Sequence, residues 1–330
     1  MHTDAANPAH HSPPALDWHV LGAGAIGGLI AAHLERQGQP TGLILASAAA
    51  RAAYPRAGLT VSPPEPCRHP WRARPAPLLA GELSRHSIRR LLIATKAHQT
   101  LGALAPLLPA LAPDALVVLL QNGMGVMERL RSLLPPPMQL VQGTTTEGVW
   151  RRSRFELVHA GRGQTLLGPA RASWRAVDTV VHCWAKANLT TRFEAAIEAP
   201  LWRKLAINCA INPYTALLQC RNGELPDHPE WRAGHGQVLA ELTALLQARG
   251  RPAELLAGIE EELRGVIAAT AANHSSMLQD LRRGAVTEMD HLNGYVVRQA
   301  RRLGLQVPEN QRLARAIQRL STGEPERPEP

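Results

Sequence analysis

The chain has 330 residues, of which 45% are hydrophobic and 19% are charged, and its formal net charge is +9. This length and composition predict a soluble globular protein with two domains and ample material for buried cores. The positive charge comes almost entirely from scattered arginines and aromatic residues are only 4% of the chain, so we do not expect nucleic-acid binding.

The cysteines and the apolar segments narrow the class of protein further. The four cysteines show no CxxC spacing and no spaced histidine cluster accompanies them, so no metal site is indicated. The apolar stretch 101–120 is broken by prolines and by Asp114, so it cannot be a membrane helix. Free thiols are typical of a reducing compartment, and we expect a cytoplasmic protein with disordered tails at residues 1–16 and 319–330.

Strands and helices alternate in the first part of the chain. Apolar runs predict strands at 18–21, 41–46, 58–62, 90–95 and 115–120, and β-rich segments at 139–143 and 155–167. Helices are predicted at 26–37, 99–111 and 126–134. This alternation is typical of a doubly wound α/β domain, which we place at residues 17–195.

The pattern changes between residues 189 and 200. Apolar residues then recur at three- and four-residue spacing over 201–218, 236–248, 252–278 and 286–303. This periodicity predicts helices, so we expect an all-helical domain at residues 196–318. Such helical domains can pair, and a homodimer is one arrangement that the sequence allows.

A glycine-rich turn follows the first predicted strand and opens the first predicted helix. It fits the pattern G-x-G-x-x-G and consists of Gly22, Ala23, Gly24, Ala25, Ile26 and Gly27. Glycines at these places permit a tight turn, a close approach of the pyrophosphate and close packing of helix on strand. The helix N-terminus adds free N–H groups and a partial positive charge, so the segment predicts dinucleotide binding.

The segment after the second predicted strand indicates which dinucleotide is bound. NAD-binding domains usually have an acidic residue there for the ribose hydroxyls. Here no Asp or Glu occurs between Glu35 and Glu65, whereas Arg51 and Arg56 do. A 2′-phosphate is attracted by arginine and repelled by a carboxylate, so NADP is favoured over NAD. The alternative is that both arginines lie in a solvated loop.

A lysine and two asparagines share one face of the first helix of the second domain. Asn208 and Asn212 lie four and eight residues after Lys204. Hydride addition to a ketone forms an alkoxide, which needs positive charge or a proton, and a lysine supplies both. The face therefore predicts a pocket for an oxygen-rich substrate, with a solvated helix surface as the alternative.

Further segments follow in a specific order. They are ATKAHQT from Ala94, QNGMG from Gln121, GTTT from Gly143, LWRKLAINCAINP from Leu201, NGEL from Asn222, SSMLQD from Ser275 and TEMD from Thr287. With the glycine turn, they resemble the ketopantoate reductase (2-dehydropantoate 2-reductase) family over about residues 18–308. The resemblance implies a Rossmann-type NADP-binding domain, an all-helical C-terminal domain and a cleft between them, where NADPH reduces ketopantoate to pantoate for pantothenate and coenzyme A synthesis.

The resemblance also implies roles for single residues. Gly22 to Gly27 would hold the pyrophosphate, Lys96 would contact the adenosine end, and Val149 would offer a backbone contact to the cofactor. Asn122 would face both nicotinamide and substrate, Lys204 would be catalytic, and Glu288 would lie near the nicotinamide ribose and that lysine. The substrate would be held by Asn122, Lys204, Asn208, Asn212, Asn222 and Ser276.

The sequence departs from the family at one position, and two other functions stay open. The family often has an arginine directly after the second strand, where this chain has Ala46 and Ser47. NADP preference would then come from Ser47, Arg51 or Lys96. A reductase of another branched 2-oxo acid would have the same site with a different pocket. A non-catalytic NADP-binding regulator would keep the fold but would not need Lys204.

Overall fold

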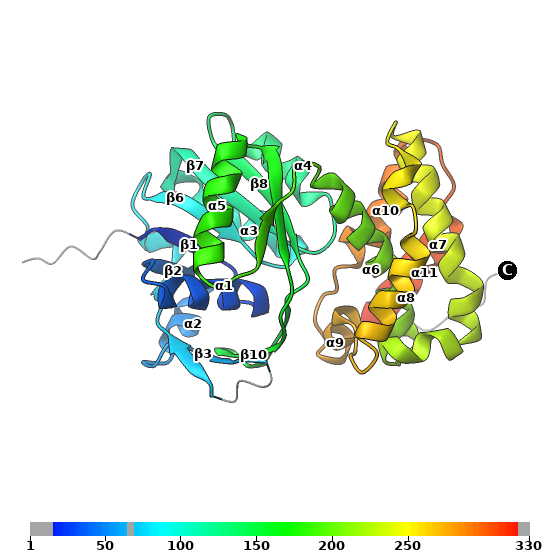
Figure 1. Cartoon of the computed structure of the whole chain (residues 1–330), viewed down its shortest axis with the longest axis horizontal. Helices are drawn as coiled ribbons and strands as arrows, with labels where there is room; N and C mark the ends of the chain where they lie inside the picture. Colours follow the sequence, from blue (N-terminus) through cyan, green and yellow to red (C-terminus); the bar gives the residue numbers. More distant parts are fainter. Residues whose placement is uncertain (1–15, 65–68, 323–330) are drawn as a thin grey trace, which may run out of the picture.

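An eight-stranded sheet forms the centre of the first domain in the computed structural model, which describes residues 16–64 and 69–322 (Figure 1). The strand order is β12-β11-β8-β7-β6-β1-β2-β5, and every neighbouring pair is parallel except β8 and β11. The strands are β1 (Trp18–Leu21), β2 (Thr41–Ile44), β5 (Ala76–Leu78), β6 (Ile88–Ile93), β7 (Leu111–Leu120), β8 (Gln139–Thr145), β11 (Thr165–Arg171) and β12 (Thr191–Phe193). The predicted doubly wound α/β domain is confirmed.

Helices cover both faces of this sheet, as their apolar sides require. One face packs against α1 (Ala25–Arg36) and α5 (Trp174–Lys186), and the other packs against α3 (Thr100–Leu104) and α4 (Val126–Leu133). The remaining short helical segments are α2 (Ala48–Ala52), η1 (Ala80–Glu82), η2 (Ala97–Gln99) and η3 (Ala105–Ala110). A single helix was predicted over 99–111. The structure instead has η2, α3 and η3 in this region, and α3 changes to the 3-10 turns of η3 where Pro106 and Pro109 lack the N–H groups that a continuous α-helix needs.

A second, four-stranded sheet lies against α1. Its order is β4-β3-β10-β9, with β3 (Leu59–Ser62), β4 (Trp71–Ala73), β9 (Gly148–Ser153) and β10 (Glu156–Gly161). The predicted β-rich segment 155–167 is therefore divided between two sheets. The division falls at Gly163, where a side chain would lie 2.2 Å from the backbone of Thr146, so the chain can turn only with glycine at this point.

The second domain is helical and packs around one long central helix. Helix α6 (Glu198–Leu218) contacts the four helices α7, α8, α9 and α11. The surrounding elements are η4 (Asn222–Asp227), α7 (Pro229–Ala248), η5 (Ala253–Leu256), α8 (Ile259–Ala269), α9 (Ser276–Arg282), η6 (Met289–His291), α10 (Asn293–Arg302) and α11 (Pro308–Thr322). Figure 1 shows α6 and α9 on the side of this domain that faces the sheet.

Three expectations about this domain need correction. The stretch 252–278, expected to be helical, consists of η5, α8 and α9: Gly258 adopts a left-handed conformation (φ +68°) between the first two, and the non-helical residues 270–275 separate α8 from α9. The predicted helix 286–303 is likewise η6 followed by α10. Helix α11 continues through Thr322, past residue 319, where a tail was expected. The rest of the expected tails, 1–15 and 323–330, lies outside the described residues. No helix in the described part of the chain has the length and apolar character needed to cross a membrane.

Candidate active site

The glycine turn between β1 and α1 has the geometry of a phosphate cradle. Gly22 has φ +113°, and a side chain there would lie 2.7 Å from the backbone of Ala94. A side chain on Gly27 would lie 2.1 Å from the Gly22 carbonyl oxygen, so this glycine permits close packing of helix on strand. Gly24 differs, because its nearest neighbour would be 3.9 Å away and the space above it is open. The first turn of α1 has no acidic residue, so its N–H groups face an environment that suits a dinucleotide pyrophosphate.

The catalytic candidate from the helical domain is anchored to the sheet. Lys204 on α6 donates a hydrogen bond from Nζ to the carbonyl oxygen of Thr145, at the end of β8, over 2.8 Å. Desolvation by the surrounding protein lowers the pKa of Lys204 from 10.5 to about 8, and the charge of Glu288 partly opposes this shift. The lysine therefore has a pKa close to neutral pH, as general acids need.

Glu288 brings several of the predicted residues together. Its Oε1 accepts a hydrogen bond from the N–H of Ala97, the residue after Lys96, over 3.2 Å. Burial raises the pKa of Glu288, and the Ala97 N–H, the Lys96 charge and the Asn122 side chain act in the opposite direction. The ends of β6 and β7 thus meet the segment before η6 at one carboxylate, next to Lys204.

Other contacts hold the two domains together around this point. Lys96 Nζ pairs with Asp280 Oδ1 of α9 at 2.5 Å. The N–H of Met124 donates to the carbonyl oxygen of His291 over 2.8 Å. A side chain on the neighbouring Gly123 would lie 2.4 Å from that same oxygen, so the close approach of the domains requires glycine there.

The asparagines predicted to hold a substrate lie on the helical side. Asn208 is half-buried and Asn212 is buried, both on the face of α6 that carries Lys204. Asn222, at the start of η4, donates from Nδ2 to Thr270 Oγ1 over 2.9 Å. Its buried Oδ1 has no hydrogen-bond partner among the described residues, so it can accept a bond from a ligand.

Two adjacent serines at the start of α9 have different surroundings. Ser275 is the buried N-cap, because its Oγ accepts from the N–H of Leu278 over 3.2 Å and bonds Thr215 Oγ1 over 2.6 Å. Ser276 is exposed and is not the cap. The predicted site serine is therefore free of the structural role that a serine at a helix start usually has.

Val149 and Ser47, which the sequence assigned to the cofactor, have different surroundings. Val149, at the start of β9, packs into the same apolar cluster as Ala23 and Ile26 of the glycine turn. Ser47 caps α2, since its Oγ accepts from the N–H of Ala50 over 3.1 Å.

Arg51, on the next turn, forms an ion pair with Glu82. Glu82 comes well after the acid-free segment 36–64 in the sequence, and the pairing of β2 with β5 brings η1 near α2. Arg56 is exposed.

Two family models match the chain in tandem. The model described as "Ketopantoate reductase PanE/ApbA" matches residues 18–172, and "Ketopantoate reductase PanE/ApbA C terminal" matches residues 196–321. The 2-dehydropantoate 2-reductase of Vibrio cholerae serotype O1 is 36% identical over 91% of this chain and 96% of its own. That of Escherichia coli O157:H7 is 37% identical over 69% and 73%.

Solved structures show the same fold. A PanE/ApbA family ketopantoate reductase from Ralstonia eutropha JMP134 has a TM-score of 0.81 at 26% identity, covering 93% of this chain and 98% of its own. D-Mandelate dehydrogenase with NADH and anilino(oxo)acetate has a TM-score of 0.84 at 19% identity, with the same coverage of 93% and 98%.

Proposed function

The chain belongs to the ketopantoate reductase (PanE/ApbA) family, and we propose that it reduces 2-dehydropantoate to pantoate with NADPH, a step of pantothenate and coenzyme A synthesis. The observation that carries this proposal is the position of Lys204. Its ammonium lies between the end of β8 and Glu288, on a helix face that also carries Asn208 and Asn212. This is a proton donor placed at the junction of a dinucleotide-binding domain and a polar pocket.

The first domain supplies the residues for the cofactor. Gly22 to Gly27 and the N-terminus of α1 hold the pyrophosphate, and Val149 adds a backbone contact. Lys96 contacts the adenosine end, while Asn122 and Glu288 flank the nicotinamide riboside. NADPH, when bound, supplies the hydride that adds to the ketone carbon of the substrate.

The helical domain supplies the residues for the 2-oxo acid. Asn122, Asn208, Asn212 and Ser276 offer hydrogen bonds to its carboxylate and ketone oxygens, and Lys204 adds positive charge. The buried Oδ1 of Asn222 has no partner among the residues that the structure describes, and we propose that it accepts a hydrogen bond from the substrate hydroxyl. This acceptor is a reason to favour a hydroxylated 2-oxo acid over a plain branched one.

Lys204 completes the reduction as the general acid. As the ketone carbon gains a hydride, its oxygen becomes an alkoxide, and Lys204 Nζ donates the proton that makes it a hydroxyl. The lysine is left neutral and regains a proton from solvent. The Thr145 carbonyl fixes one N–H of the ammonium and so directs the others, while Glu288 favours the charged form.

Arg51 is the residue that we propose for selecting NADP over NAD. It lies on α2, one helical turn after Ser47 and seven residues after the end of β2, and the adenosine ribose is held near the end of this strand in Rossmann-type folds. Ser47 already uses its hydroxyl as a helix cap, and Glu82 partly neutralises the arginine. We therefore propose a preference for NADPH that is weaker than a free arginine would produce.

We propose a cytoplasmic location for this reaction. Cys183, Cys209 and Cys220 are free thiols, as is usual for a protein that works in a reducing compartment.

Oxidation of NADPH by the purified protein with ketopantoate tests the activity. A panel of branched 2-oxo acids without the hydroxyl tests the substrate class. If kcat/KM were the same for ketopantoate and for these other 2-oxo acids, the substrate would be branched 2-oxo acids in general rather than ketopantoate.

A further inference from the structure

Helix α6 contains a proline in its interior, and this creates an unmet need for hydrogen bonding. Pro213 has no N–H, so the carbonyl oxygen of Cys209, four residues earlier, has no donor within the helix. Cys209 is completely buried, so water cannot supply the missing hydrogen bond. A buried carbonyl without a donor is costly, and the fold must supply one from elsewhere.

A side chain from α10 supplies this donor. Asn293 donates from Nδ2 to the Cys209 carbonyl oxygen over 3.2 Å, in place of the N–H that Pro213 lacks. The next carbonyl, that of Ala210, accepts a hydrogen bond from Trp231 Nε1 of α7 over 2.9 Å. The turn of α6 before the proline is therefore held by two neighbouring helices.

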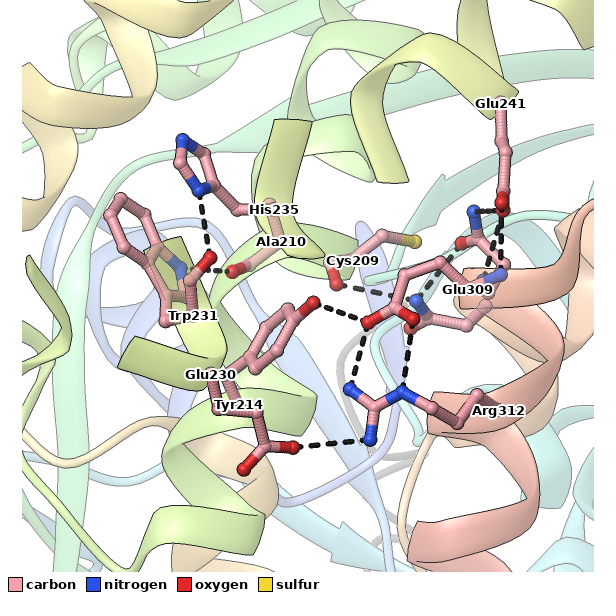
Figure 2. A network of polar contacts seen from close by, with 11 residues as sticks. Cys209, Ala210, Tyr214, Glu230, Trp231, His235, Glu241, Glu309 and Arg312 are labelled. Atoms are coloured by element: carbon pink, nitrogen blue, oxygen red, sulfur yellow. Dashed lines mark hydrogen bonds and ion pairs between the residues drawn. The ribbon is translucent and has the colours of Figure 1, made fainter. Parts of the chain in front are cut away.

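The orientation of the Asn293 amide is fixed by a chain of buried partners, which Figure 2 shows around Glu241 and Cys209. Glu241 accepts from the N–H groups of Glu309 and Asn310 at the start of α11, over 2.8 and 3.0 Å. It also accepts from Asn310 Nδ2 over 2.8 Å, which leaves Asn310 Oδ1 to accept from Asn293 Nδ2 over 3.0 Å. A flipped Asn293 amide would place oxygen against two acceptors.

The residue after the proline is tied to the same helix start. Tyr214 donates its hydroxyl hydrogen to Glu309 Oε1 over 2.5 Å, and Glu309 also pairs with Arg312 (Figure 2). Both sides of Pro213 are thus connected to the beginning of α11. The network therefore supports the path of α6 at the one place where its own backbone lacks a hydrogen-bond donor.

We propose that Asn293 is a positioning residue for substrate binding, acting through Cys209 and Pro213 on Asn212. This rests on the function proposed above, in which Asn208 and Asn212 hold the 2-oxo acid. Asn212 immediately precedes Pro213, whereas Lys204 lies two turns earlier and is anchored separately to Thr145. A change in the path of α6 between 209 and 213 would move Asn212 relative to Lys204. It would leave the glycine turn, in the other domain, unaffected.

The substitution Asn293→Leu removes the hydrogen bonds that Asn293 Nδ2 donates to Cys209 and Asn310, at nearly constant side-chain volume. We expect the KM for ketopantoate to rise about tenfold, because a displaced Asn212 would lose one buried hydrogen bond to the substrate. The dissociation constant for NADPH should stay within about twofold, because the glycine turn proposed to hold the pyrophosphate lies in the other domain. An unchanged KM, or an equal loss of NADPH affinity, would overturn the positioning role.

The double variant Pro213→Ala with Asn293→Leu is the decisive comparison. Alanine restores an N–H at position 213 that can bond the Cys209 carbonyl. In this background, Asn293→Leu should therefore lower the free energy of unfolding less, and raise the KM less, than it does when Pro213 is present. Additive effects in urea denaturation and in KM would show that Asn293 does not replace the missing N–H. If Asn293→Leu alone gives no folded protein, the double variant decides, because alanine at position 213 offers the Cys209 carbonyl an N–H from within the helix. Recovery of folded protein in the Pro213→Ala background supports the proposal, and a double variant that also fails to fold overturns it.

Failure of this inference can be told apart from failure of the proposed function. If the unmodified protein does not reduce ketopantoate, the function is wrong, yet coupling between positions 213 and 293 in the free energy of unfolding still tests the hydrogen bond. If the unmodified protein is active and no coupling is found, only the positioning role falls.

Discussion

The Nζ of Lys204 lies 2.8 Å from the carbonyl oxygen of Thr145, and this single hydrogen bond joins the central helix of one domain to the end of a strand in the other. A lysine ammonium has three N–H donors, so two remain for a substrate. Because the strand end fixes the lysine, the distance between the glycine turn and the proposed proton donor is set by the packing of the two domains.

The glycines of the first turn should separate folding from cofactor binding. Gly24→Ala adds a methyl group where the protein leaves open space, so the melting temperature should hardly change, while NADPH affinity falls by about tenfold or more. Gly27→Ala places its Cβ 2.1 Å from the Gly22 oxygen and should lower both stability and affinity. Thermal melting and NADPH fluorescence measure the two effects. Normal NADPH binding by Gly24→Ala would contradict the cradle.

The adjacent serines of α9 should show opposite phenotypes. Ser275→Ala removes the cap of α9 and should cost about 1 kcal/mol, or a Tm lower by about 3 °C. Ser276→Ala should leave the Tm unchanged and raise the KM for ketopantoate several-fold. Each variant serves as the control for the other. The same phenotype in both would mean that Ser276 has no separate contact with the substrate.

The pH dependence of the reaction should follow Lys204. Its pKa of about 8 means that the ammonium is charged below pH 8 and loses its proton above it, so kcat/KM should fall as the pH rises through about 8. Glu288 raises this pKa, so Glu288→Gln should shift the midpoint to lower pH. A pH–rate profile of both proteins checks the direction. A midpoint that stays in place or moves upward would rule out Glu288 as the neighbour that tunes the lysine.

The ion pair beside the end of β2 should limit selectivity between the cofactors. Glu82→Gln frees Arg51 for a 2′-phosphate, so kcat/KM for NADPH should rise several-fold over that for NADH. Arg51→Ala should shift the ratio toward NADH, and the exposed Arg56 provides the control through Arg56→Ala. Unaltered ratios in both the Glu82 and Arg51 variants would place the 2′-phosphate elsewhere, with Lys96 as the remaining candidate.

Local sequence patterns predicted the elements on which the site depends. The glycine turn follows a buried strand and opens a helix as expected, because steric and packing requirements at Gly22 and Gly27 act over a few residues. The shared face of Lys204, Asn208 and Asn212 follows directly from helical periodicity. These features need no knowledge of distant partners.

Features that depend on distant partners escaped prediction. Helix α5 was not predicted, since it is rich in β-branched residues and is held by packing of Val177, Val180 and Trp184 on the sheet. The role of Thr145 rests on a backbone carbonyl, which residue types do not reveal. The pairing of Glu82 with Arg51 depends on strand pairing, and the cap at Ser275 depends on which residue begins α9.

The most direct test is the oxidation of NADPH by the purified protein with ketopantoate, compared between the unmodified protein, Lys204→Ala and Lys186→Ala. Lys186 is exposed at the end of α5, away from the site, and controls for the loss of a lysine. We predict rapid oxidation by the unmodified protein and by Lys186→Ala. In Lys204→Ala the kcat should be lower by about 100-fold or more, while NADPH still binds. If Lys204→Ala kept the full turnover rate, or if the unmodified protein showed no turnover, the account of Lys204 as the acid of a ketopantoate reductase would be contradicted.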